Sequence, residues 1–402
     1  MGAHAGDVAR RARGLRLEPG DLRAVGDAGR PPRRPRVHGV ARARAHPGGL
    51  AGSHGHARRA GRPRRAHRAA RRRGAPAPAL PRRRGAVSRP RFDELPVRPG
   101  APARSSWGVF GDDDQVGTLN FIEPRHARAA AALVRDGDVH PLNWDLTLPA
   151  PGFFGRHPPS HTLFSKFDGN VVDDRLDGFY PQGSSQWDGL RHFAAAGHGF
   201  YNGATLEEVT TPGPGPLGME HWARRGIAAR AVLLDVAGAL AREGAAPDPF
   251  DRFVIDAPLL ERVAAAQGVE LREGDVLLVR TGWVEAYAAL GDDARAALAA
   301  AGRPGSPGLY GDTIPRFLWD HGIAAVAADN PALEAAAPGD GADLSLHEAL
   351  IGRLGMPLGE LWALAGLAQA CAADGRYEMF LTSAPMHLPG ASGTPANAIA
   401  VR

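Results

Sequence analysis

The sequence predicts a mixed α/β domain downstream of residue 90. Three apolar runs have the length of buried strands, and segments with helical spacing of apolar residues lie between them. Two further strand-like runs follow near the C-terminus with no helix between them, which favours some antiparallel pairing. The three apolar runs are 231–236, 276–280 and 323–328, and the late pair is 378–383 and 396–401.

The first 90 residues differ sharply in composition from the rest of the 402-residue chain. They contain 24 of the 48 basic residues, 4 of the 43 acidic ones and none of the aromatic ones, so their net charge is +20. The remainder has 24 basic and 39 acidic residues, a net charge of −15. A segment without aromatic side chains buries too little apolar surface to offset its chain entropy. We therefore expect a disordered basic extension at 1–95 and one folded domain at 96–402.

Two origins of this extension are possible. Its richness in Arg, Ala, Gly and Pro is what a GC-rich coding sequence gives when translation is assigned to a start codon that lies too far upstream, and we favour this origin. A functional basic tail could bind nucleic acid by releasing counterions. The extension lacks interleaved aromatic residues and any nucleic-acid-binding motif, so nucleic acid is not an expected partner.

The first elements of the domain are short. A Pro- and Arg-rich linker at 91–104 leads to Trp107, where order should begin. The Ala and Arg content of 123–134 favours a helix. Residues 138–149 alternate enough for a strand, and 157–200 have the Gly, Ser and Asp content of short strands and loops.

Helices are expected between the later strands, at 258–267, 293–301 and 314–320. Asp256 precedes the first of them as an N-cap, and Gly322 ends the third. A further helical segment at 346–354 carries His347. Because a proline favours the first turn of a helix, Glu360, three residues after Pro357, is expected in such a turn.

The single cysteine, Cys371, excludes an intramolecular disulfide and lies in an apolar run, where a small buried side chain is expected. No apolar run approaches 18 residues, and the Arg-rich N-terminus lacks the apolar segment of a secretory signal. We therefore expect a cytoplasmic protein without a membrane contact.

Residues 182–192, with the sequence QGSSQWDGLRH, gather amide, carboxylate and imidazole side chains between turn-forming residues. Asp188 lies four positions before His192, and Gln182 and Gln186 precede it. In a tight loop or a helix start these side chains can converge, which suits a metal site or acid–base chemistry. The alternatives are a turn-capping role for Asp188 and a hydrogen-bonded core position for His192.

This stretch resembles the signature His-x-Gly-Thr-His-x-Asp-x-Pro-x-His of the cyclase family of metal-dependent hydrolases, which includes kynurenine formamidase and isatin hydrolase. Asp188 matches the Asp ligand of the signature and His192 its last, catalytic His. Gln182 and Gln186 stand where two metal-binding His would be. The segments around His347 and at 359–361 resemble the downstream His and Glu of the family. Other similar segments, in the same order, are 231–236, 274–283, 327–331 and 393–401.

The resemblance implies a swivelling β/β/α domain with a mixed central sheet, assembled as a homodimer or homotetramer. It implies His192 as the general acid or base, with His347 and Glu360 completing the reaction centre. It also implies a divalent metal, Mn or Zn, held by Asp188, Gln182, Gln186, His347 and Glu360.

The two glutamines affect which metal the site can bind and how tightly, because an amide oxygen is a weaker zinc ligand than an imidazole nitrogen. Three outcomes follow: a harder metal such as Mn or Mg held by oxygen atoms, a reorganised site that recruits His161 or His198, or a metal-free site that works by acid–base chemistry. We favour the first two together, since Asp188, His347 and Glu360 keep an anionic set that contains nitrogen.

Four residues are candidates for substrate contact. Trp187 and Phe193 would suit an aromatic substrate, although a hydrophobic core explains them as well. Arg280 ends a strand, where it could meet a substrate carboxylate or form a structural ion pair. His161, in a loop upstream of the motif, could line the pocket.

We expect an arylformamidase-like amidohydrolase that cleaves a carbon–nitrogen bond in a small cyclic or N-acyl substrate. The resemblance implies hydrolysis of N-formylkynurenine, a step of tryptophan catabolism. The alternative is a degenerate family member that binds a small ligand without turnover. The sequence has neither a phosphate-binding glycine loop nor a Gly-x-Ser-x-Gly elbow, which disfavours a nucleotide-binding protein and a serine hydrolase.

Overall fold

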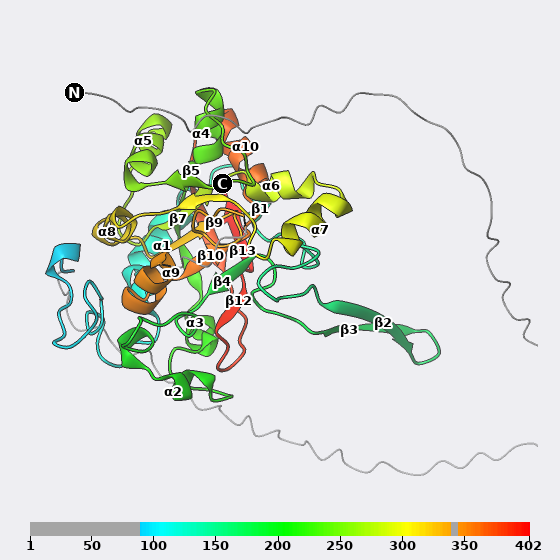
Figure 1. Cartoon of the computed structure of the whole chain (residues 1–402), viewed down its shortest axis with the longest axis horizontal. Coiled ribbons are helices and arrows are strands. Elements are labelled where there is room, and N and C mark those ends of the chain that lie inside the picture. Colours follow the sequence, from blue (N-terminus) through cyan, green and yellow to red (C-terminus); the bar gives the residue numbers. More distant parts are fainter. Residues whose placement is uncertain (1–88, 339–344) are drawn as a thin grey trace, which may run out of the picture. The chain divides into compact units, whose positions relative to one another are not determined.

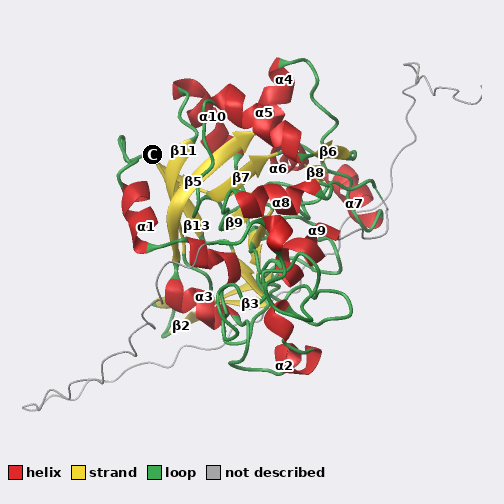
Figure 2. Ribbon diagram, turned by 90° about the vertical axis from the view of Figure 1, so that its left-hand side faces the viewer, coloured by secondary structure: helices red, strands yellow, loops and turns green. Residues whose placement is uncertain are grey.

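The computed structural model describes residues 89–338 and 345–402, so the predictions for residues 1–88 lie outside the described part. Within that part the chain folds around a nine-stranded mixed sheet flanked by helices (Figures 1 and 2), which confirms the predicted α/β class. In order across the sheet, the strands are β1 (Val139–Pro141), β13 (Ala398–Val401), β11 (Glu378–Ser383), β5 (Ile227–Asp235), β7 (Val276–Arg280), β9 (Ala325–Ala328), β10 (Leu358–Glu360), β4 (Gln186–Asp188) and β12 (Gly393–Pro395).

Four neighbouring strands, β5, β7, β9 and β10, run parallel in the middle of this sheet. Leu278 of β7 pairs with Leu233 of β5 on one side and with Ala327 of β9 on the other. All three side chains are fully buried, which is why these strands appear in the sequence as continuous apolar runs. Beyond this block the pairing is antiparallel, with β11 beside β5 and β4 beside β10.

Helices lie on both sides of the sheet: α1 and α5 both contact β5, and Figure 2 shows them on opposite sides of it. The described helices are α1 (Pro124–Ala131), α2 (Leu206–Thr210), α3 (Met219–Arg225), α4 (Val236–Arg242), α5 (Ala257–Gln267), α6 (Trp283–Ala288), α7 (Asp292–Ala300), α8 (Thr313–Asp320), α9 (Ser345–His347) and α10 (Ala365–Asp374). A π-helical turn, η4 (Glu348–Arg353), continues α9, and 3₁₀ turns lie at η1 (Phe92–Glu94), η2 (Gly117–Phe121) and η3 (Tyr201–Gly203).

The predicted helix ends are confirmed around α5. The Asp256 carboxylate accepts a hydrogen bond from the backbone N–H of Leu259 at 3.0 Å, which satisfies one of the free donors of the first turn. Gly268 follows the helix with a φ of 68°, a left-handed conformation that favours glycine.

The predicted helical position of Glu360 is wrong, because this residue ends strand β10. The adjacent Gly359 explains the strand. A Cβ atom at this position would lie 2.4 Å from the Cβ of Ala327, so glycine lets β10 approach β9 closely enough to pair. Strand pairing thus overrides the local preference that Pro357 gives to a helix.

Residues before position 96 also take part in the described fold. Phe92 and Leu95 are buried in the core, and the indole N–H of Trp319 donates to the carbonyl oxygen of Pro90 at 2.9 Å. The strand expected at 138–149 shortens to β1.

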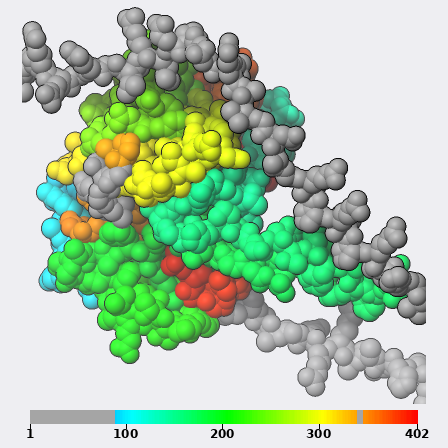
Figure 3. Space-filling model, turned by 45° about the vertical axis from the view of Figure 1, so that its right-hand side comes forward, coloured from blue at the N-terminus to red at the C-terminus, as the bar shows by residue number. Residues whose placement is uncertain are grey.

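Strands β2 (Ser160–Lys166) and β3 (Val171–Asp177) form a separate antiparallel hairpin that projects from the body (Figures 1 and 3). It confirms the short strands expected in this region. Because side chains alternate across a strand, one face carries Leu163, Val172 and Leu176, which are 65%, 65% and 43% exposed. The opposite face carries the ion pairs Lys166–Asp173 and Arg175–Asp177.

A small parallel pair supports the loop after β9. Strands β6 (Phe253–Ile255) and β8 (Pro307–Leu309) pair with each other, and Leu309 forms a bridge with Glu334. The loop is thereby held in an extended conformation that leads Glu334 toward α9.

Cys371 is fully buried on α10, as expected for a small apolar side chain. Among the helices of residues 89–338 and 345–402, none combines the length and the apolar character needed to cross a membrane.

Candidate metal centre

The centre is built on the antiparallel pair of β4 and β10. Gln186 pairs directly with Glu360, and Asp188 with Leu358. Since side chains alternate along a strand, Gln186 and Asp188 point to one face of the sheet and Trp187 to the other. Two candidate metal ligands of β4 therefore share a face with Glu360.

Trp187 lies in the core on the opposite face. Its ring packs edge to face against Trp362 with centroids 4.7 Å apart, and its indole N–H donates to Ser383 Oγ at 3.1 Å. With no exposed surface, Trp187 does not reach the cluster in the structure, and the alternative of a core residue describes it.

A tight bend after β4 brings His192 back to Asp188. The backbone N–H of His192 donates to the carbonyl oxygen of Gly189 at 2.9 Å, and its Nε2 lies 3.7 Å from Asp188 Oδ2. Gly189 is required here, because a Cβ would lie 2.0 Å from Met219 Cε and 2.8 Å from the carbonyl oxygen of Ser392. The bend is closed by backbone atoms of Gly189 and His192, and the Asp188 carboxylate lies beside the imidazole of His192.

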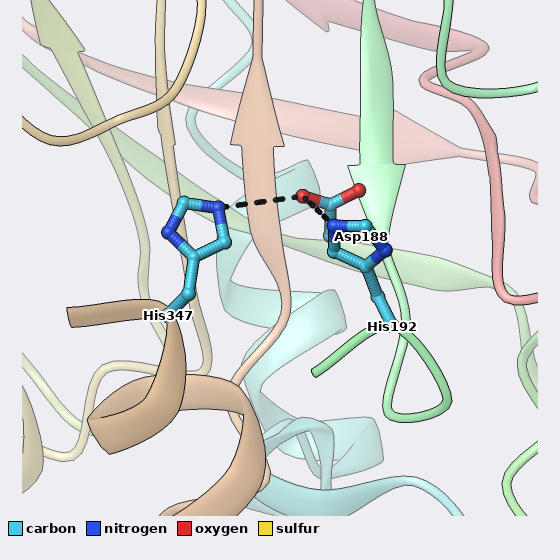
Figure 4. Close-up of side chains that lie close together, drawn as sticks. All are labelled: Asp188, His192 and His347. Carbon is cyan, nitrogen blue, oxygen red and sulfur yellow. Dashed lines mark ion pairs between the residues drawn. The ribbon is translucent and has the colours of Figure 1, made fainter. Parts of the chain in front are cut away.

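His347 approaches from the end of α9 (Figure 4). Its Nε2 lies 3.1 Å from Glu360 Oε1 and 3.8 Å from Asp188 Oδ2. One ligand atom from each of Asp188, His192 and His347 falls within 4.8 Å of the others. Segments that are more than 150 residues apart in the sequence thus meet at one point.

Glu334 is a member of the centre that the sequence did not reveal. Its Oε1 accepts hydrogen bonds from the backbone N–H of His347 at 2.9 Å and from the ring Nδ1 at 2.7 Å. Donation from Nδ1 fixes the ring and directs Nε2 toward Asp188 and Glu360. No sequence pattern links Glu334 to His347, because the bridge to β8 creates their contact.

Both glutamines direct amide groups at the carboxylates. Gln186 Nε2 donates to Glu360 Oε2 at 2.6 Å, and Gln182 Nε2 donates to Asp188 Oδ1. Gln182 Oε1 accepts a hydrogen bond from Ser392 Oγ at 3.2 Å. The amide orientation follows from the partners, since a carboxylate oxygen accepts and the NH₂ group is the donor.

Of the other candidate residues, only Phe193 lies beside the cluster, with its ring centroid 5.6 Å from that of His347. Arg280 forms ion pairs with Asp235 and Glu285, which agrees with the structural alternative. His161 lies on the projecting hairpin and contacts Asp174 at 3.1 Å. The site therefore does not recruit His161.

His198 is exposed and hydrogen-bonds its own loop, at the carbonyl oxygen of Ala196, so it is not recruited either. Arg156 is a second residue that the sequence did not reveal. Its guanidinium donates to the carbonyl oxygen of Gln182 at 2.8 Å and lies close enough to influence the charges of His192 and Glu360.

The Cyclase family model matches residues 140–335. A solved structure described as a novel cyclase is 34% identical to this chain, with a TM-score of 0.66, and the alignment covers 74% of this chain and 99% of that one. The chain belongs to the Cyclase family.

Two solved structures of isatin hydrolase A also resemble this chain, at lower similarity. The one from Labrenzia aggregata is 16% identical with a TM-score of 0.47, and the alignment covers 67% of this chain and 94% of that one. The one from Ralstonia solanacearum is 16% identical with a TM-score of 0.46, covering 69% and 95%. No curated protein matches the sequence.

The centre holds more buried negative than positive charge. Burial alone would lower the pKa of His347, but its hydrogen bonds with Glu334 and Glu360 outweigh burial and raise the pKa to about 10. Burial, with the charge of Asp188 added, raises the pKa of Glu360 to about 7. Neighbouring carboxylates contribute to both shifts, because they favour the charged form of His347 and disfavour a further negative charge on Glu360, whereas burial opposes the first shift and drives the second.

His192 differs from His347 in its surroundings. Its side chain is 24% exposed, against 4% for His347. Burial lowers the pKa of His192, Asp188 opposes this shift, and the positive charges of His347 and Arg156 reinforce it. A lowered pKa leaves the ring neutral near pH 7, which is the form that accepts a proton.

The residues of this centre fit a divalent cation. Asp188 Oδ2 and Gln186 Oε1 are buried acceptors without a hydrogen-bond partner among the described residues. Unpaired buried acceptors are costly unless something positive meets them. Two ligand atoms about 2.1 Å from one ion lie roughly 3.0–3.4 Å apart at right or tetrahedral angles. The 3.1 Å separation between His347 Nε2 and Glu360 Oε1 suits that arrangement.

Proposed function

We propose that the chain is a metal-dependent hydrolase that acts on a carbon–nitrogen bond, of the amide type, in a small cyclic or N-acyl substrate. The observation that carries the proposal is the convergence of Asp188, His347 and Glu360 around unpaired buried acceptors, next to a half-buried His192. An arylformamidase-like reaction, the opening of an N-formyl amide, is the finer form of this proposal.

A divalent ion, Mn or Zn, would be held by Asp188, His347 and Glu360 and would supply Lewis acidity toward a carbonyl oxygen or a water molecule. His192 performs the proton transfers. Its neutral Nε2 removes a proton from the attacking water and then delivers it to the leaving nitrogen as the carbon–nitrogen bond breaks. Asp188, 3.7 Å away, stabilises the imidazolium formed between these steps.

Phe193 and Arg156 offer contacts for the organic part of the substrate. Phe193 presents an aromatic ring beside His347 and is only partly buried, so it can pack on an apolar or aromatic group. Arg156 is also partly exposed and can attract a carboxylate. A small aromatic amide that also carries a carboxylate therefore matches the side chains around the centre better than a long aliphatic amide does.

A second candidate function is a family member that binds a small ligand without turnover. The hydrogen bonds of Gln182 and Gln186 to Asp188 and Glu360 favour it, since they satisfy carboxylate oxygens without a metal.

One experiment separates the two functions. Metal-free protein, prepared with a chelator, is assayed against cyclic amides, lactones and formanilides before and after addition of Mn²⁺ or Zn²⁺. The hydrolase predicts turnover only with metal and its loss in His192→Ala. The matched control is His198→Ala, which removes an imidazole outside the cluster and should keep full activity. Ligand binding without turnover under every condition favours the binder.

We also infer a homodimer or homotetramer. The support is the apolar face of the β2–β3 hairpin, because a lone two-stranded hairpin is marginally stable in water and usually packs against something. The same face carries His161 and Asp174, which pair with each other within the chain at 3.1 Å, so the face presents apolar side chains and no unpaired charge from these two groups. The same apolar patch on a second copy of this chain, turned about a two-fold axis, is the expected partner.

A further inference from the structure

We propose that this centre takes one divalent ion per chain, because Gln182 and Gln186 act as fixed hydrogen-bond donors that occupy the carboxylate oxygens a second ion would need. This inference rests on the proposed metal-dependent function and specifies its metal content. Its basis is the direction of the two amide groups.

Gln186 is fixed by strand register. It stands directly opposite Glu360 in the β4–β10 pair, and its NH₂ group donates to Glu360 Oε2 at 2.6 Å. The side chains are 1% and 3% exposed, so water cannot replace this bond. Glu360 therefore keeps one oxygen, Oε1, for a metal, and that oxygen faces His347 Nε2.

Gln182 is fixed from the other side. Its NH₂ group donates to Asp188 Oδ1, while its oxygen accepts from Ser392 and thus points away from the cluster. Gly393 makes room for it, since a Cβ there would lie 2.5 Å from Gln182 Cγ. Asp188 likewise keeps a single free oxygen, Oδ2, which has no partner among the described residues.

Two of the remaining atoms, Asp188 Oδ2 and Gln186 Oε1, have no hydrogen-bond partner among the described residues. The other two, His347 Nε2 and Glu360 Oε1, hydrogen-bond each other at 3.1 Å, and an ion would replace that bond once Nε2 has lost its proton. One divalent ion can use the remaining oxygens of Asp188 and Glu360. A second ion would need Asp188 Oδ1 and Glu360 Oε2, which already accept hydrogen bonds from Gln182 and Gln186.

Metal counting tests this inference. The full chain is stripped with a chelator, dialysed against Mn²⁺ or Zn²⁺, and analysed for ions per chain by elemental analysis and by calorimetric titration. The expected result is one. Two ions per chain would overturn this inference and leave the proposed function standing, whereas none would remove both.

Substitution of the amides identifies their role. In Gln186→Glu a carboxylate replaces the donor that faces Glu360, so the variant should bind a second ion, raising the content from one to two per chain. Gln115→Glu, the same change outside the cluster, should stay at one. A variant with an unchanged fold by circular dichroism and still only one ion would show that the amide is not what excludes the second ion.

Discussion

The two histidines of the centre have different freedom. His347 has hydrogen-bond contacts at both ring nitrogens and is almost fully buried. Its ring is therefore held in one position, which suits a metal ligand but not a group that must move with the substrate. His192 Nε2 lies 3.7 Å from Asp188 Oδ2, and the side chain is partly exposed. The same nitrogen of His192 could bind the ion or transfer a proton, and one atom cannot do both at once.

The variant His192→Ala separates these roles. If Nε2 transfers protons, turnover should fall by about 10²–10⁴-fold, the usual contribution of a general acid or base, while the metal content stays the same. The measurement pairs kcat with elemental analysis on one preparation. Loss of the ion together with activity would make His192 a ligand instead.

Glu334 acts on the centre through His347. In Glu334→Ala the ring loses the acceptor that holds Nδ1, so metal affinity should fall by about 10–100-fold, as is usual when such a partner of a ligand is removed. Glu334→Gln keeps an acceptor oxygen and should retain more of the affinity. Competition with a chromogenic chelator measures both, and Glu207→Gln, on α2, is the control for loss of a distant carboxylate. Equal affinities in all three variants would deny Glu334 this positioning role.

Among the elements, the bend after β4 tolerates no side chain at position 189. In Gly189→Ala the added methyl would overlap Met219 Cε and the Ser392 carbonyl, so the bend must shift and His192 with it. We expect destabilisation of about 1–3 kcal/mol, typical of overpacking, and reduced turnover. The control is Gly366→Ala in α10, where a Cβ would meet nothing within 4 Å and alanine should stabilise the helix. Thermal unfolding compares them, and equal melting temperatures would contradict the packing argument.

The β2–β3 hairpin gives a second test at this scale. If its apolar face contacts another copy, the double variant Leu163→Ser and Val172→Ser should shift the molar mass measured by light scattering toward the monomer. Val171→Ser, on the opposite face, is the matched control and should leave the mass unchanged. A wild-type chain that is already monomeric, or a double variant that keeps the wild-type mass, would show that the hairpin does not form the contact between copies.

For the whole molecule, the sequence predicts strands and helices best where an apolar pattern coincides with a residue that marks the end of the element, such as a helix cap. The strands around Leu233, Leu278 and Ala327, and the cap at Asp256, follow from such local patterns. Glu360 was assigned to the wrong element because its strand depends on the pairing of β10 with β9 and β4, which no local pattern reports.

The same distinction explains the site. The motif around Asp188, together with the segments of His347 and Glu360, named residues that the structure brings together. The contact of Glu334 with His347 depends on the pairing of the Glu334 loop with the distant strand β8, so the local sequence does not predict it. The sequence leaves Trp187 open between a substrate contact and a core residue, because the alternation along β4 that turns its ring into the core depends on β4 being a strand.

The pH dependence of stability is a property of the whole fold and gives the last prediction. Asp329 is fully buried, and burial, together with the charge of Glu285, raises its pKa to about 6. An unfolded Asp titrates near ~3.9. Between these two values the folded state binds more protons, so the contribution of Asp329 to the free energy of unfolding is complete below about pH 4 and is lost as pH rises through 6.

The variant Asp329→Asn isolates that contribution. Other carboxylates titrate in the same range, but they are common to both proteins, so the difference between wild type and variant reports Asp329 alone. We expect the stability advantage of the wild type to shrink by about 3 kcal/mol between pH 4 and 7, as a shift of about two pKa units implies. Urea unfolding at several pH values measures it, with Asp292→Asn on the exposed start of α7 as control. Parallel pH curves for wild type and Asp329→Asn would show that this carboxyl group titrates normally in the fold.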